Sequence, residues 1–359
     1  MKIDDSASLL RDLAPESKIL IIRLRSLGDL VLETPVVAAL SNWRPDLRIH
    51  LLIEPRFAPV FEGNPAVSGL ICSGNLVGTA ALLRKHRFPI AYNQHGGPRS
   101  ALLTWACGSP RRVCWRGFQF SAMYNVLAPD AKEFYGRPIV HAVEHRISQF
   151  YWTGLPRGPI PRAQLFPQGA AFERVRRALS ALGIEPSAAY AVLQPGARLA
   201  GMRWPAEKFA QLARWLSEQQ GITSVVNLPP ADAVVAAEVR GAMGSLARFP
   251  GPFSISELIA LIAEARLFVG NDSGPAHVAA ATGCPAVVIY GQTNPAQWHP
   301  WQGRYRAVHT GAVFNPGRAD KSLAEHEWRP IGSIEVGEVS EACAELLTSS
   351  PSGLNRGES

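Results

Sequence analysis

One segment brings together small, acidic and histidine residues where an apolar stretch ends: NDSGPAHVAAATGCP, residues 271–285. Asp272 and Ser273 are types that cap helices, and we expect a helix to start at Gly274. The free N–H groups and the positive end of its dipole would form an anion site, which His277 in the first turn could join. The alternative is a well-capped helix with a structurally satisfied histidine.

The segment SLGDLVLETP, residues 26–35, places Asp29 where a buried strand turns into a helix. A carboxylate there can accept a proton from a hydroxyl group as a general base, given a near-neutral or modestly shifted pKa. The alternative interpretation is an ordinary aspartate N-cap. The residue types alone leave both open.

A third segment, QPGARLAGMRWPAEKFAQL, follows another apolar run at residues 194–212. Its PGA sequence, which ends at Ala197, predicts a loop whose backbone can approach phosphate groups closely. Trp204 precedes the next helix and either stacks on a ligand or, as we favour for a lone tryptophan, packs in the core.

The fourth segment, PRSALLTWACGSPRRVCWR at residues 98–116, is rich in arginine. Arg99, Arg111, Arg112 and Arg116 could recognise phosphate or carboxylate groups, because a guanidinium offers two parallel donors to such oxygens. A solvated basic face explains them equally well.

These segments lie in an alternation of apolar runs and amphipathic stretches that predicts an α/β fold with doubly wound parallel sheets. We expect strands at 18–24, 49–54, 68–72, 89–94, 190–194, 222–228, 266–270 and 286–291, and one helix from about Leu30 to Trp43. The proline- and glycine-rich stretch 153–169 is typical of a linker. We therefore predict domains at 1–160 and 170–332, a cleft between them, and a helix at 333–350 that packs back on the first domain.

Composition narrows the classes of function. The 359 residues carry a net charge of +7, which fits an anionic partner, but also a merely basic surface. No RNA-binding aromatic motif or zinc finger occurs, so we expect no nucleic-acid partner. No apolar run is long enough to span a membrane, and the acidic N-terminal segment does not resemble a secretory signal, which favours the cytoplasm.

Several cofactor and metal signatures are missing from the sequence. No GxGxxG follows the first apolar run, and neither a GxxxxGK[ST] loop nor a GxSxG elbow occurs. The five cysteines and nine histidines lack the spacings of metal ligands. We expect no cofactor and no metal.

The quoted segments, together with HAVEHR at 141–146, resemble in order and spacing the bacterial lipopolysaccharide heptosyltransferases of glycosyltransferase family 9. The resemblance covers nearly the whole chain. It implies a GT-B fold, in which two Rossmann-like domains face each other, with the acceptor on the first and the nucleotide sugar on the second. It also implies an inverting, metal-independent transfer of heptose from ADP-heptose to lipid A–Kdo or a heptosylated core, at the cytoplasmic face of the inner membrane.

By the same resemblance, Asp29 is the general base, and Asp272, Ser273, Gly274 and His277 surround the donor. Many members carry a donor-contacting lysine where this chain has Met202. Arg198 or Arg203 could replace that charge, and we favour Arg198 slightly. Asp232 is a loose match to the acid that meets the ribose.

Two other functions remain open. The missing lysine would also fit a catalytically silent protein that binds nucleotide sugars or glycolipids, although Asp29 speaks against this. A transferase of another sugar is the second alternative. The arginine-bearing first domain and the lack of a spanning segment further predict peripheral, salt-sensitive contact with an anionic membrane.

Overall fold

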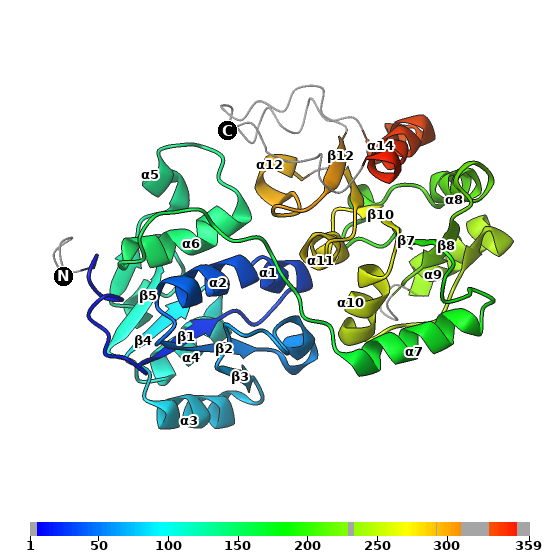
Figure 1. Ribbon diagram of the computed structural model, residues 1–359. Helices are drawn as coiled ribbons and strands as arrows, with labels where there is room; N and C mark the ends of the chain where they lie inside the picture. The colour runs from blue at the N-terminus through cyan, green and yellow to red at the C-terminus, as the bar shows by residue number, and fades with distance from the viewer. Residues whose placement is uncertain (1–5, 229–232, 292, 310–329, 350–359) are drawn as a thin grey trace. The chain divides into compact units, whose positions relative to one another are not determined.

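The structure is a computed structural model, and it describes residues 6–228, 233–291, 293–309 and 330–349 of the chain. The chain divides into two compact units, Met1–Pro161 and Arg162–Ser359. Within each unit a parallel sheet is covered on both faces by helices (Figure 1).

In the described part of the first unit, the sheet has six strands in the order β3-β2-β1-β4-β5-β6. The apolar run KILII forms the central strand β1, because a strand covered on both faces must be apolar throughout. The strands are β1 (Lys18–Ile22), β2 (Arg48–Ile53), β3 (Gly69–Cys72), β4 (Ile90–Asn93), β5 (Arg111–Trp115) and β6 (Val126–Ala128).

Helices cover both faces of this sheet. Leu20 and Ile22 of β1 pack against Leu83 of α3 (Leu76–His86) and Leu103 of α4 (Pro98–Ala106). The remaining helices are α1 (Leu27–Val31), α2 (Thr34–Trp43), α5 (Ala131–Tyr135) and α6 (Ala142–Trp152), with short 3₁₀ turns η2 (Pro55–Val60) and η3 (Ser121–Met123). Of these, α2 packs against α6.

The prediction of a single helix from Leu30 to Trp43 is wrong. The chain forms α1 and then α2, and Pro35 occupies the first turn of α2, where its missing N–H costs no intrahelical bond. Strands β5 and β6 were not expected, because the charged side chains of Arg111 and Arg112 interrupt the apolar pattern at the start of β5.

The second unit repeats the architecture, with a described sheet in the order β12-β11-β10-β7-β8-β9. Its strands are β7 (Tyr190–Gln194), β8 (Thr223–Val226), β9 (Ala247–Arg248), β10 (Leu267–Asn271), β11 (Ala286–Tyr290) and β12 (Tyr305–His309). Its helices are α7 (Gly169–Ser180), α8 (Ala206–Gln220), α9 (Ala233–Met243), α10 (Ile255–Ala263), α11 (Gly274–Thr282), α12 (Pro295–Trp298) and α14 (Val336–Thr348), with 3₁₀ turns η4 (Ala200–Met202), η6 (Gly244–Leu246) and η7 (Ile331–Ser333).

The last helix, α14, packs in the core of the second unit. It lies against α8 and β12 of the second unit, and its buried residues Val339, Cys343 and Leu346 belong to that unit's core. The sequence marked an amphipathic helix but not which core would bury it.

Both sheets have the strand order of a dinucleotide-binding Rossmann fold, counted from β1 and from β7. The order reverses between β1 and β4 in the first unit and between β7 and β10 in the second. In open α/β sheets ligands bind beyond the carboxyl ends of the strands at such a reversal. The segment of Asp29 follows β1, and the segments of Ala197 and Asp272 follow β7 and β10.

No helix in the described ranges has the length and apolar character required to cross a bilayer.

Candidate active site

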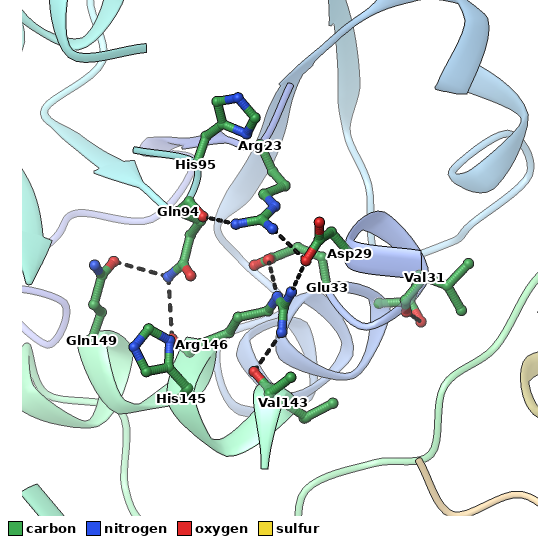
Figure 2. A network of polar contacts seen from close by, with 12 residues as sticks. Arg23, Asp29, Val31, Glu33, Gln94, His95, Val143, His145, Arg146 and Gln149 are labelled. Atoms are coloured by element: carbon green, nitrogen blue, oxygen red, sulfur yellow. Dashed lines mark hydrogen bonds and ion pairs between the residues drawn. The ribbon is translucent and has the colours of Figure 1, made fainter. Parts of the chain in front are cut away.

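Asp29 lies in the first turn of α1, just beyond β1. Its Oδ2 accepts a hydrogen bond from the Ser26 hydroxyl at 2.9 Å and faces the Ser26 backbone N–H at 3.3 Å, which forms a capping box. Its Oδ1 instead pairs with the guanidiniums of Arg23 and Arg146. Asp29 is therefore not a simple N-cap, because one oxygen serves the helix and the other serves two cations (Figure 2).

Arg146 holds this cluster together from α6. Its Nη2 lies 2.5 Å from Asp29 Oδ1, and its Nη1 donates to the Ala142 carbonyl oxygen at 2.6 Å. Its Nε lies 3.6 Å from Glu33 Oε2. The side chain is almost completely buried, at 4% exposure, so its charge must be balanced by these carboxylates rather than by water.

The pKa of Asp29 differs from what we expected. Burial alone would raise it, but the charges of Arg23 and Arg146 outweigh burial and hold the pKa well below the usual aspartate range. The expectation of a near-neutral or modestly shifted pKa is therefore wrong. Asp29 is ionised, and ready to accept a proton, at every pH at which an enzyme works, but the same two cations make it a weak base.

Glu33, which precedes α2, is the least expected member of the cluster. Its side chain is fully buried, and both carboxylate oxygens lack a hydrogen bond to any described residue. Burial raises the pKa of Glu33 to about 7, although the charges of Arg146 and Arg23 oppose the shift and that of Asp29 adds to it.

Buried amide groups connect this cluster to the neighbouring elements. Arg23 donates through Nη1 to the carbonyl oxygen of Gln94, directly after β4. The Gln94 side chain donates to Gln149 Oε1 at 2.9 Å and to the Arg146 carbonyl oxygen at 3.1 Å. The ends of β1 and β4 are thereby tied to α6, as Figure 2 shows.

In the second unit, Asn271 organises the corresponding strand ends. Its Nδ2 donates to the Pro195 carbonyl oxygen at 2.7 Å, and its Oδ1 accepts from the Trp204 backbone N–H at 3.0 Å. The fully buried amide thus fixes both ends of the loop after β7 against the end of β10. Trp204 packs in the core, as favoured, and its Nε1 donates to the Ile334 carbonyl oxygen at 3.0 Å.

Asp272 follows Asn271 and accepts a 2.5 Å hydrogen bond from the Thr293 hydroxyl. Burial raises the pKa of Asp272 to about 6, while this hydrogen bond opposes the shift. Asp272 therefore lies at the end of β10 as a largely buried carboxyl group with a raised pKa.

Ser273 takes the N-cap position of α11 but does not cap it with its side chain, because its hydroxyl donates to the Asn271 carbonyl oxygen at 3.1 Å. The expected capping role of Ser273 is therefore only positional. Gly274 begins the helix, and His277 is buried in its first turn. The helix terminus thus presents backbone N–H groups and a positive dipole end beside Asp272.

Two glycines let backbones meet tightly at this strand end. A Cβ on Gly270 would come within 2.8 Å of the Gln194 Cβ on the neighbouring strand. A Cβ on Gly291 would come within 2.8 Å of the Gly201 carbonyl oxygen. The segments after β7, β10 and β11 therefore converge, which brings the predicted donor residues near Ala197 and Asp272 into one region of the second unit.

The cations expected to replace the missing lysine differ in their surroundings. The Nε of Arg203 donates to the Ala197 carbonyl oxygen at 2.8 Å, so this side chain turns back onto the PGA loop. Arg198 is exposed directly after that loop, and Met202 ends η4 half-buried. Asp232 lies outside the described residues.

The predicted acceptor arginines do not form one group. Arg111 and Arg112 begin β5, at the amino ends of the strands, whereas Asp29 follows a carboxyl end. Arg112 also bonds within its own unit, with Nε donating to the Met123 carbonyl oxygen at 2.8 Å. Arg116 follows the carboxyl end of β5 and pairs with Glu133, and Arg99 donates to the Gly74 carbonyl oxygen at 2.6 Å. Of these four arginines, only Arg99 and Arg116 follow the carboxyl ends of strands, as Asp29 does.

Sequence reasoning missed Arg23, Glu33, Arg146 and Asn271 as site residues. A signal was present for two of them, because Arg23 and Glu33 interrupt apolar stretches on either side of Asp29. Arg146 is 117 positions from Asp29, so no local pattern could pair them. Asn271 was visible only as part of a motif.

Comparisons with known proteins agree with this geometry. The model of glycosyltransferase family 9 (heptosyltransferase) matches residues 79–324. Lipopolysaccharide heptosyltransferase 3 of Escherichia coli K12 is 26% identical over 77% of this chain and 83% of its own. Lipopolysaccharide heptosyltransferase 2 of the same strain is 26% identical over 81% and 87%.

Solved structures show the same fold. A glycosyltransferase family 9 protein from Veillonella parvula aligns with a TM-score of 0.83 at 23% identity, covering 94% of this chain and 99% of its own. ADP-heptose LPS heptosyltransferase II of E. coli aligns with a TM-score of 0.77 at 23% identity, covering 92% and 98%. The α/β fold of two Rossmann-like units is therefore the GT-B fold, as expected. The chain is an enzyme of glycosyltransferase family 9, the heptosyltransferases.

Proposed function

We propose that this enzyme transfers a heptose from ADP-heptose to the Kdo or heptose inner core of lipopolysaccharide, with inversion and without a metal. The observation that carries the proposal is the position of Asp29, ionised by Arg23 and Arg146 at the strand-order reversal of the first unit. The names of the similar proteins, lipopolysaccharide heptosyltransferases 1, 2 and 3, support the substrate class.

In the proposed reaction, an acceptor hydroxyl oxygen attacks C1 of the heptose. The bond from C1 to the diphosphate oxygen breaks, and its electron pair leaves with ADP. Asp29 takes the proton of the attacking hydroxyl. The N-terminus of α11, Asp272, Ser273, Gly274 and His277 surround the diphosphate and sugar, and Arg198 supplies a full positive charge beside the departing phosphate.

The acceptor is a glycolipid, so we propose that the enzyme works peripherally at the cytoplasmic face of the inner membrane. Arg99 and Arg116, which follow the carboxyl ends of strands as Asp29 does, are the candidates for contact with anionic groups of the acceptor. Arg111 and Arg112 are not proposed for this role, because they lie at the amino ends of the strands.

Helix α3 supports membrane contact by the first unit. Val77 is 80% exposed and Leu82 is 41% exposed on this helix, and Trp105 is 52% exposed on the neighbouring α4. The helix ends in exposed basic residues, and Arg84 Nε donates to the Ala106 carbonyl oxygen at 2.8 Å, which joins the two helix ends. A surface that offers both exposed apolar side chains and cations suits the interface of an anionic bilayer.

We expect the double substitution Val77→Asp/Leu82→Asp to weaken binding to anionic vesicles by about tenfold or more, since it removes apolar contact and adds repulsion. The measurement is co-sedimentation with phosphatidylcholine vesicles that contain or lack phosphatidylglycerol, at low and high salt. Val234→Asp, at an 83% exposed valine of the second unit, is the matched control. Equal binding by both variants would exclude α3 as the contact.

The transfer itself is tested by donor-dependent release of nucleoside diphosphate with isolated lipid A–Kdo and heptosylated acceptors. ADP-heptose should be turned over, and a panel of other nucleotide sugars should be turned over much more slowly. Preference for another sugar would replace the proposed donor. Binding without turnover of any donor would instead support a silent binding protein.

The same assay with EDTA tests the metal-independent route, because the proposed charge compensation comes from Arg198 and a helix N-terminus. Turnover should persist with the chelator. Loss of turnover that magnesium or manganese restores would refute this part of the proposal.

A further inference from the structure

Asp29 is a weak base because two arginines stabilise its ionised form, yet the proposed reaction requires it to accept a proton. Its Oδ1 is paired with Arg23 and Arg146, and both pairs must weaken when Asp29 becomes neutral. Arg146 has no access to water that could then stabilise its charge, because its side chain is 4% exposed. Proton uptake by Asp29 would leave a buried guanidinium without a counter-charge unless another anion is present.

Glu33 is placed to be that anion. Its Oε2 lies 3.6 Å from Arg146 Nε, beside the Nη2 of the same guanidinium that contacts Asp29 (Figure 2). The Nε of Arg146 and both Glu33 oxygens are buried, and none of them has a hydrogen bond within the described residues. Shortening this distance by somewhat less than about 1 Å would turn the long ion pair into a charge-assisted hydrogen bond.

Building on the proposed transfer reaction, we propose that Glu33 is a positioning residue that acts through Arg146. Its carboxylate becomes the main counter-ion of Arg146 as Asp29 accepts the acceptor proton. The ionised Glu33 also weakens the hold of Arg146 on Asp29 beforehand, which strengthens Asp29 as a base. The proton moves only from the hydroxyl to Asp29, and Glu33 supplies charge without taking part in bond making.

Other titratable groups around the cluster do not provide this function. Arg23 and Arg146 are cations, and Asp29 is the base itself. Burial, followed by neighbouring arginine charges, lowers the pKa of His95 and of His145 to about 4, so both are neutral where the enzyme works. With its pKa raised to about 7 by burial, Glu33 is the described group of this cluster whose charge changes near neutral pH.

The pH dependence follows with a definite sign. Above about pH 7 Glu33 is ionised and assists proton uptake, and below it Glu33 is neutral and Asp29 faces both guanidiniums alone. We expect kcat of the wild-type protein to fall by about threefold to tenfold as pH decreases through this range, since base strength is only partly expressed in rate. The Glu33→Gln protein should show the lower kcat at all these pH values, without the inflection, and with KM for the donor nearly unchanged.

The experiment measures kcat against pH for wild-type, Glu33→Gln and Glu33→Asp proteins, with Glu62→Gln at an exposed glutamate of the same unit as control. The aspartate variant retains a carboxyl group and should retain an inflection. Glu62→Gln should match the wild type. A wild-type profile without an inflection near pH 7, or the same profile in Glu33→Gln, would overturn the inference while leaving the transfer reaction intact.

A readout without substrate separates this inference from the proposed function. Ionising a fully buried glutamate costs stability, so Glu33→Gln should raise Tm relative to wild type at about pH 8 and much less at about pH 5. A Tm difference that does not change with pH would also overturn the inference, even if no donor were found. A pH-dependent difference with no turnover of any donor would refute the proposed function alone.

Discussion

Asp29→Asn should lower kcat by about 10²-fold or more, because the amide cannot accept the proton of the attacking hydroxyl. The affinity for the donor should change little, since the predicted donor residues belong to the second unit. The measurements are steady-state kinetics for the acceptor and calorimetric binding of the nucleotide sugar. Near-normal kcat would reduce Asp29 to a member of the Ser26 capping box.

Loss of structure must be separated from loss of chemistry here, because Asp29→Asn leaves Arg23 and Arg146 with less counter-charge. Removing one partner of a buried ion pair costs about 3–5 kcal/mol in unfavourable cases. Tm is therefore measured beside kcat, and Asp29→Glu provides a charged variant with a displaced oxygen. Asp46→Asn, which removes the carboxylate that pairs with Arg44, is a control that should retain turnover.

Arg198→Ala should lower kcat/KM by about 10²-fold, because in the proposed reaction Arg198 supplies a full charge to the departing diphosphate, whereas the helix terminus supplies only about half a unit. Arg203→Ala should have a smaller effect on transfer, since its Nε is already engaged by the Ala197 carbonyl oxygen. Met202→Lys should raise activity in the Arg198→Ala background. Kinetics at saturating acceptor compare the three proteins.

Arg214→Ala, at an exposed arginine of α8, controls for the loss of one positive charge from the second unit. It should leave kcat/KM unchanged. Full activity of both Arg198→Ala and Arg203→Ala would show that no arginine replaces the family lysine. The N-terminus of α11 and His277 would then have to stabilise the leaving group.

Much of the fold was predictable because its central strands are buried on both faces. KILII and YAVLQ are apolar or nearly so throughout, which is the local signature of the interior of a parallel sheet. The edge strands were not predictable in this way. Strand β9 has only two residues, and β5 begins with two arginines, so neither carries an apolar run long enough to recognise.

The candidate site, too, was predictable only where it depends on local sequence. Local spacing placed Asp29 after β1 and Asp272 to His277 at the start of α11, because each is a short motif bound to one strand end. It did not reveal that Asp29 is held by Arg146, or that Ser273 bonds to Asn271 rather than capping α11. Those contacts depend on side-chain directions and on segments distant in sequence.

By itself, the sequence determined the family, the alternation of strands and helices, and the residue types at the strand ends, since hydrophobic period and short motifs are local properties. Tertiary structure decided the charge state and the partners. Packing α6 against α2 buries Arg146 between Asp29 and Glu33, which lowers the pKa of one carboxyl group and leaves that of the other raised. It also assigned α14 to the second core and separated Arg112 from Asp29. Burial and ion pairing are sums over neighbours that only the folded chain brings together.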